Sequence, residues 1–170
     1  MTTARDRITV RRTYLELARP SGVITPYASG LDLEEVDDVG LYLSIYRGVG
    51  EQYRWTDRLG WDTATARSHL ANPSVRVRML RQGGMPAGFY ELVSGDDSAV
   101  ELAYFGLMPA WIGRGLGRTL LERALSDAWD IGAARVWLHT CSLDHPAAMA
   151  NYLARGFRPF REETYQVEPA

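Results

Sequence analysis

The residues of this chain that are best suited to chemistry lie in a glycine-rich segment that follows a short apolar run. Glycines occupy every second position from Gly113 to Gly117, and Arg114 and Arg118 stand beside them. Pro109 ends the apolar run, and leucines and alanines at helical spacing follow the glycines. A helix start has free N–H groups and a partial positive charge, and glycines let an anion approach the backbone. The segment therefore predicts a phosphate-binding site between a strand and a helix.

Two common phosphate motifs do not fit this spacing. A P-loop needs four residues between its glycines and then Gly-Lys-Ser/Thr, whereas here Arg118 stands directly before Thr119. A dinucleotide fingerprint needs GxGxxG, and Arg118 occupies the place of its third glycine. The plain alternative is a strand–helix junction whose glycines only allow tight packing. The two flanking arginines favour the anion site over that alternative.

Length, charge and cysteine content limit the function classes. A chain of 170 residues suits one domain, which we place at 1–170. A net charge of −2 gives no general electrostatic reason to bind nucleic acid. The single cysteine, Cys141, excludes an internal disulfide and the usual metal-ligand spacings. The charged N-terminus lacks the apolar core of a signal peptide, and no apolar stretch reaches the ~20 residues of a membrane span. We therefore expect a cytoplasmic protein without a metal ion or a membrane partner.

Hydrophobic periodicity predicts an α/β chain around the glycine segment. Three strands in succession form an antiparallel meander, and the helix after the glycines allows the next strand to run parallel to the third. Strands are predicted at 8–17, 74–80, 87–93, 102–107, 135–140, 157–160 and 164–167. Helices are predicted from the acidic residues 32–35 to 48–50, at 63–70, from 115 to 131–132 and at 147–155.

An unusual aromatic segment connects the first two helices. Tyr53, Trp55 and Trp61 lie there among arginines and aspartates. One interpretation is that the aromatic rings cap the core and the charges face solvent. The other is that the segment forms one wall of a substrate pocket, with aromatic surface for shape and charges for orientation. The sequence alone leaves both open.

Two motifs together resemble a known family. The run Arg114-Gly115-Leu116-Gly117 after the strand ELAYFGLMP resembles the coenzyme A pyrophosphate loop of the GNAT superfamily of acetyltransferases. The segment HPAAMANYLARGF resembles that family's NxxAxxxYxxxGF ending. Two positions depart from the family pattern: Ile112 replaces the usual Arg or Gln before the glycines, and His145 replaces the asparagine of the second motif. The resemblance covers residues 75–167.

This resemblance implies a fold, a cofactor and a reaction. The implied fold is a mixed, mostly antiparallel sheet of six to seven strands flanked by about four helices, with the cofactor in the cleft between the two central parallel strands. The implied cofactor is acetyl-coenzyme A. The implied reaction is acetyl transfer to a primary amine of a small molecule or an amino acid, by direct attack in a ternary complex. The residues that the resemblance assigns to the cofactor are Leu107, Met108, Gly113, Arg114, Gly115, Leu116, Gly117, Arg118 and His145.

Acetyl transfer to an amine needs a proton acceptor and a proton for the departing thiolate. The resemblance implies that Glu101 takes the amine proton and that Tyr152 protonates the coenzyme A sulfur. His139 and His145 are alternative bases. Cys141 is a further candidate, as a carrier of the acetyl group, but no activating partner stands near it in the sequence.

Two other functions remain open at this stage. One is a non-catalytic module that senses acyl-coenzyme A, and the other is a protein or peptide N-acetyltransferase. Tyr53, Trp55 and Trp61 favour a walled pocket, so we assign them to substrate binding. The expected partner is a small-molecule amine and not a nucleic acid, and the oligomeric state, including a homodimer, is left open.

Overall fold

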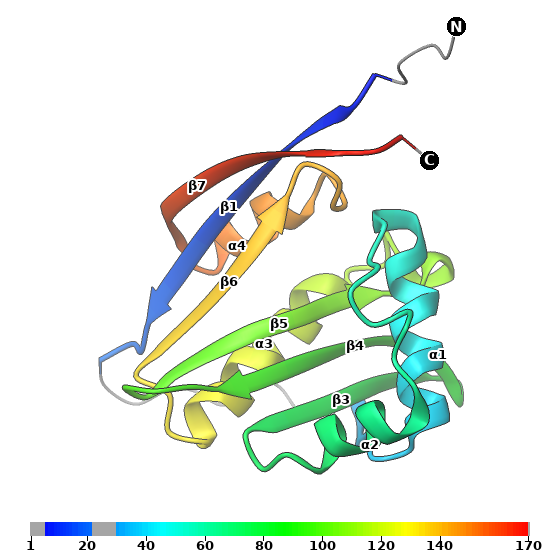
Figure 1. Cartoon of the computed structure of the whole chain (residues 1–170). Helices are drawn as coiled ribbons and strands as arrows, with labels where there is room; N and C mark the ends of the chain where they lie inside the picture. The colour runs from blue at the N-terminus through cyan, green and yellow to red at the C-terminus, as the bar shows by residue number, and fades with distance from the viewer. Residues whose placement is uncertain (1–5, 22–29, 170) are drawn as a thin grey trace, which may run out of the picture.

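Seven strands form one mixed sheet in the computed structural model, which describes residues 6–21 and 30–169 (Figure 1). The strands are β1 (Ile8–Ala18), β2 (Asp32–Glu35), β3 (Val75–Gln82), β4 (Met85–Ser94), β5 (Ala99–Leu107), β6 (Arg135–Cys141) and β7 (Arg158–Val167). Their order in the sheet is β2-β3-β4-β5-β6-β1-β7. β5 and β6 are parallel, and every other neighbouring pair is antiparallel. The predicted meander and the parallel strand after it are confirmed.

Four α-helices in the described residues cover the two faces of this sheet. They are α1 (Val39–Gly50), α2 (Thr63–Ala71), α3 (Leu116–Asp130) and α4 (Ala148–Ala154). Neighbouring residues of a strand point to opposite faces, so Phe89 and Tyr90 of β4 belong to different apolar clusters. The cluster of Tyr90 includes α3, and the cluster of Phe89 includes α1. The predicted fold, a mixed sheet flanked by about four helices, is confirmed. None of the helices in the described segments is long and apolar enough to cross a membrane.

Local capping signals determine where two of the helices begin. Asp62 accepts a hydrogen bond from the Thr65 N–H at 2.7 Å, which begins α2 where the sequence predicted it. Asp38 accepts from the Leu41 N–H at 2.7 Å and begins α1. The prediction that α1 begins at residues 32–35 is therefore wrong.

Those acidic residues form a strand because arginines of the neighbouring strand pair with them. β2 lies antiparallel to β3, and Glu34 receives two hydrogen bonds from Arg81, at 2.9 and 3.0 Å. Val36 stays extended after β2, with its N–H bonded to the Val77 carbonyl at 2.9 Å. Charge complementarity across the sheet thus outweighs the local preference of acidic residues for a helix start.

The end of the chain also differs from its prediction. Residues 157–160 and 164–167 were predicted as two strands, but β7 is continuous from Arg158 to Val167. The register of its pairing with β1 shifts between Tyr14 and Leu15, and the two strands stay paired on both sides of this shift.

The N-terminal strand occupies an interior position in the sheet. β1 is paired on one side with β6 and on the other with β7 (Figure 1). Val10 and Leu15 of β1 are fully buried, so this strand belongs to the core. The insertion places Arg12 opposite Cys141, beside the end of β6. The sequence predicted the strand but not this position.

The two parallel strands are paired over only a short stretch. Ala99 to Glu101 of β5 pair with Arg135 to Trp137 of β6, and no pairing continues beyond them. Ala103 has no partner in the β4–β5 register, which marks a bulge just after the paired stretch. Figure 1 shows β5 and β6 diverging beyond this point. The divergence opens a wedge in the sheet, and the site lies there.

Candidate functional site

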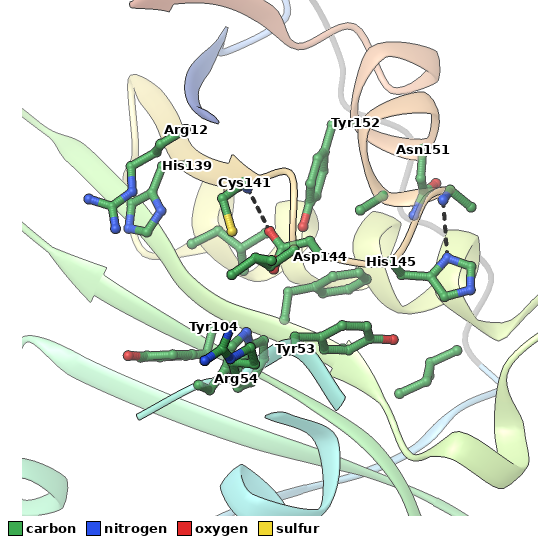
Figure 2. Close-up of a pocket in the computed structure, with 18 of the residues that line it drawn as sticks. Arg12, Tyr53, Arg54, Tyr104, His139, Cys141, Asp144, His145, Asn151 and Tyr152 are labelled. Carbon is green, nitrogen blue, oxygen red and sulfur yellow. Dashed lines mark hydrogen bonds between the residues drawn. The ribbon is translucent and has the colours of Figure 1, made fainter. Parts of the chain in front are cut away.

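A cavity of about 660 Å³ fills the wedge between β5 and β6 (Figure 2). Its walls come from the second half of β5, the loop before α3, the end of β6, the first turns of α4 and the segment that follows α1. β1 contributes Arg12, β7 contributes Tyr165 and Val167, and Glu168 follows directly after β7. In Figure 2, Arg12 and His139 lie on one side of the cavity, His145 and Asn151 on the other, and Tyr152 between them.

The glycine loop and the start of α3 form the end of the cavity beside His145. Gly113 and Gly115 have φ values of 80° and 77°, a conformation that glycine adopts without strain. No side chain caps the first turn of α3, so its N–H groups are open to a ligand. Asn151 of α4 donates to the Gly117 carbonyl at 3.3 Å and holds the two helices together. This end of the cavity has the features of a phosphate site.

Tyr152 supplies a buried phenol to the middle of the cavity. Its side chain is 7% exposed and packs edge-on against Phe105 and Phe157. Burial, and to a smaller extent the nearby Asp144 carboxylate, raises the pKa of the phenol well above its usual value. Tyr152 is therefore protonated at neutral pH and can donate a proton.

Asp144 is held in place beside this phenol. Its carboxylate accepts hydrogen bonds from the Thr140 hydroxyl at 2.7 Å and the Cys141 N–H at 2.8 Å. Both donors are uncharged, so the negative charge of Asp144 is not neutralised by them. Burial, followed by this charge, raises the pKa of the Cys141 thiol. Cys141 is therefore a thiol rather than a nucleophilic thiolate, which argues against an acetyl-cysteine.

The segment after α1 forms the opposite wall. Tyr53 and Trp55 line the cavity, and Trp55 also packs against Tyr46 and Tyr104 with ring centroids 5.7 and 4.9 Å apart. Trp55 thus packs in the core and also lines the cavity, and its role in substrate binding stays a prediction. Asp57 of the same segment accepts a hydrogen bond from the Tyr104 hydroxyl at 2.7 Å.

The charges on this side of the cavity leave a negative excess. Arg12 is paired with Glu163 at 3.1 Å, and Glu168 is paired with Arg7 at 2.9 Å. Arg54 donates to the backbone carbonyl of Glu168 and not to a carboxylate. Arg118, at the glycine-loop end, is paired with Glu122 at 3.2 Å. Within the described residues, the cavity lining thus leaves Asp57, Asp144 and Arg54 without an ion-pair partner. Such a surface favours a cationic ligand over an anionic one.

A buried ion pair lies beneath the aromatic wall. Arg58 is 9% exposed, and its guanidinium donates to the carboxylate of Glu91, which is fully buried, and to the Tyr42 hydroxyl. Tyr42 donates to the same carboxylate at 2.8 Å, and the His69 ring lies 2.7 Å from its other oxygen. These partners compensate the buried Glu91 carboxylate. Removal of its cation would leave an uncompensated charge in a low-dielectric interior, which is strongly destabilising.

This ion pair anchors the segment that bears the cavity wall. The Arg58 guanidinium lies over the rings of Trp61 and Tyr104, at 4.8 and 4.4 Å from their centroids. Trp61 does not line the cavity but packs beneath it on Arg58. Arg58 therefore holds the wall segment, residues 53–57, against the sheet.

The predicted site residues divide into those that the fold brings to the cavity and those that it does not. Cavity-lining residues among them are Leu107, Gly113, Gly117, Arg118, His145, Tyr152, Tyr53 and Trp55. The Met108 side chain packs towards Gly48 of α1, and Arg114 stacks on Trp111. Gly115 and Leu116 begin α3 without lining the cavity.

Glu101 lies outside the cavity, at the closed end of the wedge. It is the last residue of β5 that pairs with β6, opposite Trp137, and it is absent from the cavity lining. Burial raises the pKa of its carboxyl, and the Glu91 charge adds to this, while Arg58 opposes it. A raised pKa suits a base, but the position does not give direct contact with a ligand in the cavity. Its role as base stays a prediction.

Other cavity residues were missed by sequence reasoning. Arg12, Asp57 and Asp144 come from three segments that lie far apart in the chain. None belongs to a local motif, so no spacing in the sequence indicates that they converge. No group of three or more metal-ligating side chains suited to a metal ion is found within residues 6–21 and 30–169.

Comparison with known proteins gives a consistent family. The protein-family model that is described as the acetyltransferase (GNAT) family matches residues 41–157 of this chain. An uncharacterised N-acetyltransferase of Mycobacterium tuberculosis is 33% identical over 97 residues, which are 55% of this chain and 62% of that protein. The mycothiol acetyltransferase of Nocardia farcinica is 33% identical over 132 residues, covering 64% of this chain and 42% of that protein. This chain thus spans less than two thirds of either relative.

Solved structures show the same fold at lower sequence identity. A GCN5-related N-acetyltransferase from Kribbella flavida has a TM-score of 0.63 and 19% identity, covering 94% of this chain and 58% of that one. The ribosomal-protein-S18-alanine N-acetyltransferase of Escherichia coli has a TM-score of 0.61 and 19% identity, covering 83% and 96%. An aminoglycoside acetyltransferase from a soil metagenome has a TM-score of 0.64 and 13% identity, covering 74% and 87%.

We predict that Arg58→Met lowers the free energy of unfolding by about 3–5 kcal/mol, because it leaves the Glu91 carboxylate buried without its cation. Urea denaturation followed by circular dichroism measures this. The matched control is Arg81→Met, which removes the partly exposed ion pair with Glu34 on the same sheet and should cost far less. Equal losses in the two variants would show that the buried pair does not anchor the wall.

Proposed function

We propose that this chain, which belongs to the acetyltransferase (GNAT) family, transfers an acetyl group from acetyl-coenzyme A to a primary amine. The observation that carries the proposal is the cavity itself. It joins an uncapped helix start, a buried phenol and a negatively charged wall in the wedge between β5 and β6. These three features correspond to what a phosphate-bearing thioester and a cationic acceptor require.

The residues present fit acetyl-coenzyme A. The N–H groups of the first turn of α3, together with Gly113, Gly117 and Arg118, would hold the phosphates. Leu107 and the opened edges of β5 and β6 would hold the pantetheine arm. His145 is a weaker candidate for that arm, because its Nδ1 already accepts the Ala147 N–H at 3.1 Å. Acetyl-coenzyme A supplies the acetyl group as an activated thioester.

The acceptor is proposed to be an amine because of the charges on the aromatic side. Asp57 and Asp144 attract an ammonium group, while Tyr53 and Trp55 give a flat apolar surface for the rest of the molecule. An alkylammonium has a pKa near ~10 and must lose a proton before it attacks. The similar proteins are named as differently as a mycothiol acetyltransferase, an aminoglycoside acetyltransferase and a ribosomal-protein-S18-alanine N-acetyltransferase, so their names do not select one acceptor.

Tyr152 is proposed to protonate the departing sulfur. Its phenol lines the cavity, and its raised pKa keeps the proton on the oxygen at neutral pH. The hydroxyl can therefore donate a hydrogen bond to the sulfur and pass its proton to it as the carbon–sulfur bond breaks. Proton donation at this point makes the sulfur a better leaving group.

The proposed activity predicts acetyl-coenzyme A-dependent thiol release with at least one amine. A suitable panel contains amino acids, an aminoglycoside and a peptide that begins with alanine, with thiol release followed by a colorimetric reagent and products identified by mass spectrometry. Binding of acetyl-coenzyme A without turnover on any amine would contradict the enzyme and support a sensor module. Turnover restricted to peptides would replace the small-molecule acceptor with a protein terminus.

We predict that Gly117→Asp raises the Kd of acetyl-coenzyme A by about tenfold or more, because a carboxylate at the helix start repels the phosphates. The variant should fold, since aspartate in a first helical turn is favourable and a Cβ at Gly117 meets neighbours at 3.8 and 3.9 Å, ordinary contacts. Gly117→Ala is the control for added bulk. Calorimetric titration that gave the same affinity for both variants would place the phosphates elsewhere.

We predict that Tyr152→Phe lowers kcat by about tenfold or more while the Kd of acetyl-coenzyme A stays unchanged. The phenylalanine ring keeps the packing on Phe105 and Phe157 and lacks only the proton donor. Steady-state kinetics and calorimetry together measure the two quantities. A weaker affinity with an unchanged kcat would make Tyr152 a binding residue instead.

A further inference from the structure

His139 stands at the first position of β6 beyond the paired stretch that faces the cavity. Trp137 is the last paired residue of β6, and alternation along the strand sends Leu138 into the core and His139 to the open side. Among the described residues, neither ring nitrogen of His139 has a hydrogen-bond partner, whereas His145 and His69 are both engaged. A histidine with two unoccupied nitrogens therefore lies at the inner end of the cavity.

Charged groups from four separate segments surround this ring. Arg12 of β1 carries the nearest positive influence, and Glu163 of β7, Asp144 after β6 and Asp57 after α1 contribute negative charge. Arg12 is itself held by Glu163 at 3.1 Å and by Tyr165 at 3.4 Å. Figure 2 shows the His139 ring beside the Arg12 side chain.

His139 is an exposed residue whose ring is partly desolvated by the cavity walls; this desolvation is the largest influence on the imidazole, and Arg12 is the second. Both lower the pKa of His139 below its usual value near ~6.5, while the three carboxylates oppose them. The remaining titratable side chains that line this part of the cavity, Tyr104, Cys141 and Tyr165, all have raised pKa values and are neutral at pH 7. The ring is therefore uncharged at neutral pH and able to take a proton.

We propose that His139 is the proton acceptor of the acetyl transfer, in the place that the sequence resemblance gave to Glu101. The ammonium group first loses one proton to solvent. The neutral amine nitrogen then bonds to the acetyl carbonyl carbon, and this nitrogen gives its second proton to a ring nitrogen of His139. The carbon–sulfur bond breaks, and the sulfur takes the Tyr152 proton. His139 later releases its proton to solvent, from which Tyr152 regains one. This inference rests on the proposed function.

Position separates His139 from Glu101. His139 lines the same cavity as Asp57 and Tyr53, where the amine is expected, and the Asp57 charge acts on its ring. Glu101 lies behind the closed end of the wedge, next to the Arg58–Glu91 pair. A base needs hydrogen-bond contact with the reacting nitrogen, directly or through one water. The geometry gives direct access to His139 alone of these two residues.

The test compares His139→Gln with Glu101→Gln on an amine that the wild-type protein acetylates. We expect His139→Gln to lower kcat by about 10²–10⁴, the usual worth of a positioned base, and Glu101→Gln to cost less. Trp137→Phe is the matched control on the same strand and the same face, outside the cavity, and should keep its kcat. Acetyl-coenzyme A affinity and thermal unfolding of His139→Gln should match the wild type.

Two further readouts distinguish chemistry from structure. The wild-type kcat should fall with decreasing pH below about 6.5, where the imidazole becomes protonated, and this limb should be absent in His139→Gln. Imidazole added to His139→Ala should restore part of the lost rate. Proton NMR of the wild type should show one histidine with a pKa below 6.5 whose signal disappears in His139→Gln.

The outcomes separate the two proposals. If the wild type acetylates no amine in the panel, the proposed function fails, and with it the role of His139. If the wild type is active but His139→Gln keeps its kcat and its acid limb, the inference about His139 is wrong and the proposed function stands. A larger loss in Glu101→Gln than in His139→Gln would return the role to Glu101.

Discussion

The site depends on one interruption in the sheet, the loss of pairing between β5 and β6 after Glu101 and Trp137. Three residues of each strand pair, and then the strands diverge at the bulge of Ala103. A fully paired sheet would have no room between these strands, so neither the glycine loop nor α4 would border a common cavity. The paired stretch is equally necessary, because it fixes the angle of divergence and closes the inner end. Glu101 lies at that closed end, whereas His139 lies where the strands begin to diverge, at the inner end of the cavity. This explains why only one of these two nearby residues contacts the cavity.

An opened sheet needs support on its far side, and the N-terminal strand provides it. β6 has lost β5 as a partner over its second half, yet β1 pairs with it from Arg135 to Cys141. β1 in turn pairs with β7, so β6, β1 and β7 form a continuous three-stranded part of the sheet beside the cavity. The arrangement carries Arg12 to the cavity, where Glu163 and Tyr165 of β7 fix its guanidinium. A residue from the first strand can therefore influence the pKa of His139 on the sixth.

Local signals in the sequence were sufficient for most of the fold and for one end of the site. The cap at Asp62, the glycines before α3 and the helix between two apolar strands each act through neighbours in the chain, so their effects are readable from spacing. Contacts between distant segments were not readable. The strand at residues 32–35 depends on arginines of β3, and the approach of Asp57 to the cavity depends on Arg58 reaching the buried Glu91. The position of Glu101 relative to the cavity could not be predicted for the same reason. Its place on a strand does not show where the pairing with the neighbouring strand ends.

Desolvation, full for the buried Tyr152 and partial for the exposed His139, favours the charge states that the reaction needs in the proposed donor and acceptor. A low dielectric disfavours the charged form of any group, so it raises the pKa of the Tyr152 phenol and lowers that of the His139 imidazole. One is thereby kept as a proton donor and the other as a proton acceptor by the same property of the cavity. Arg12, which is half-buried and paired with Glu163, adds to the lowering of the His139 pKa, while the buried Arg58 is paired with Glu91. Asp57 and Asp144 can then attract an ammonium group, while the side chains proposed to react, Tyr152 and His139, are uncharged. Different residues of the cavity thus recognise the acceptor and transfer the protons.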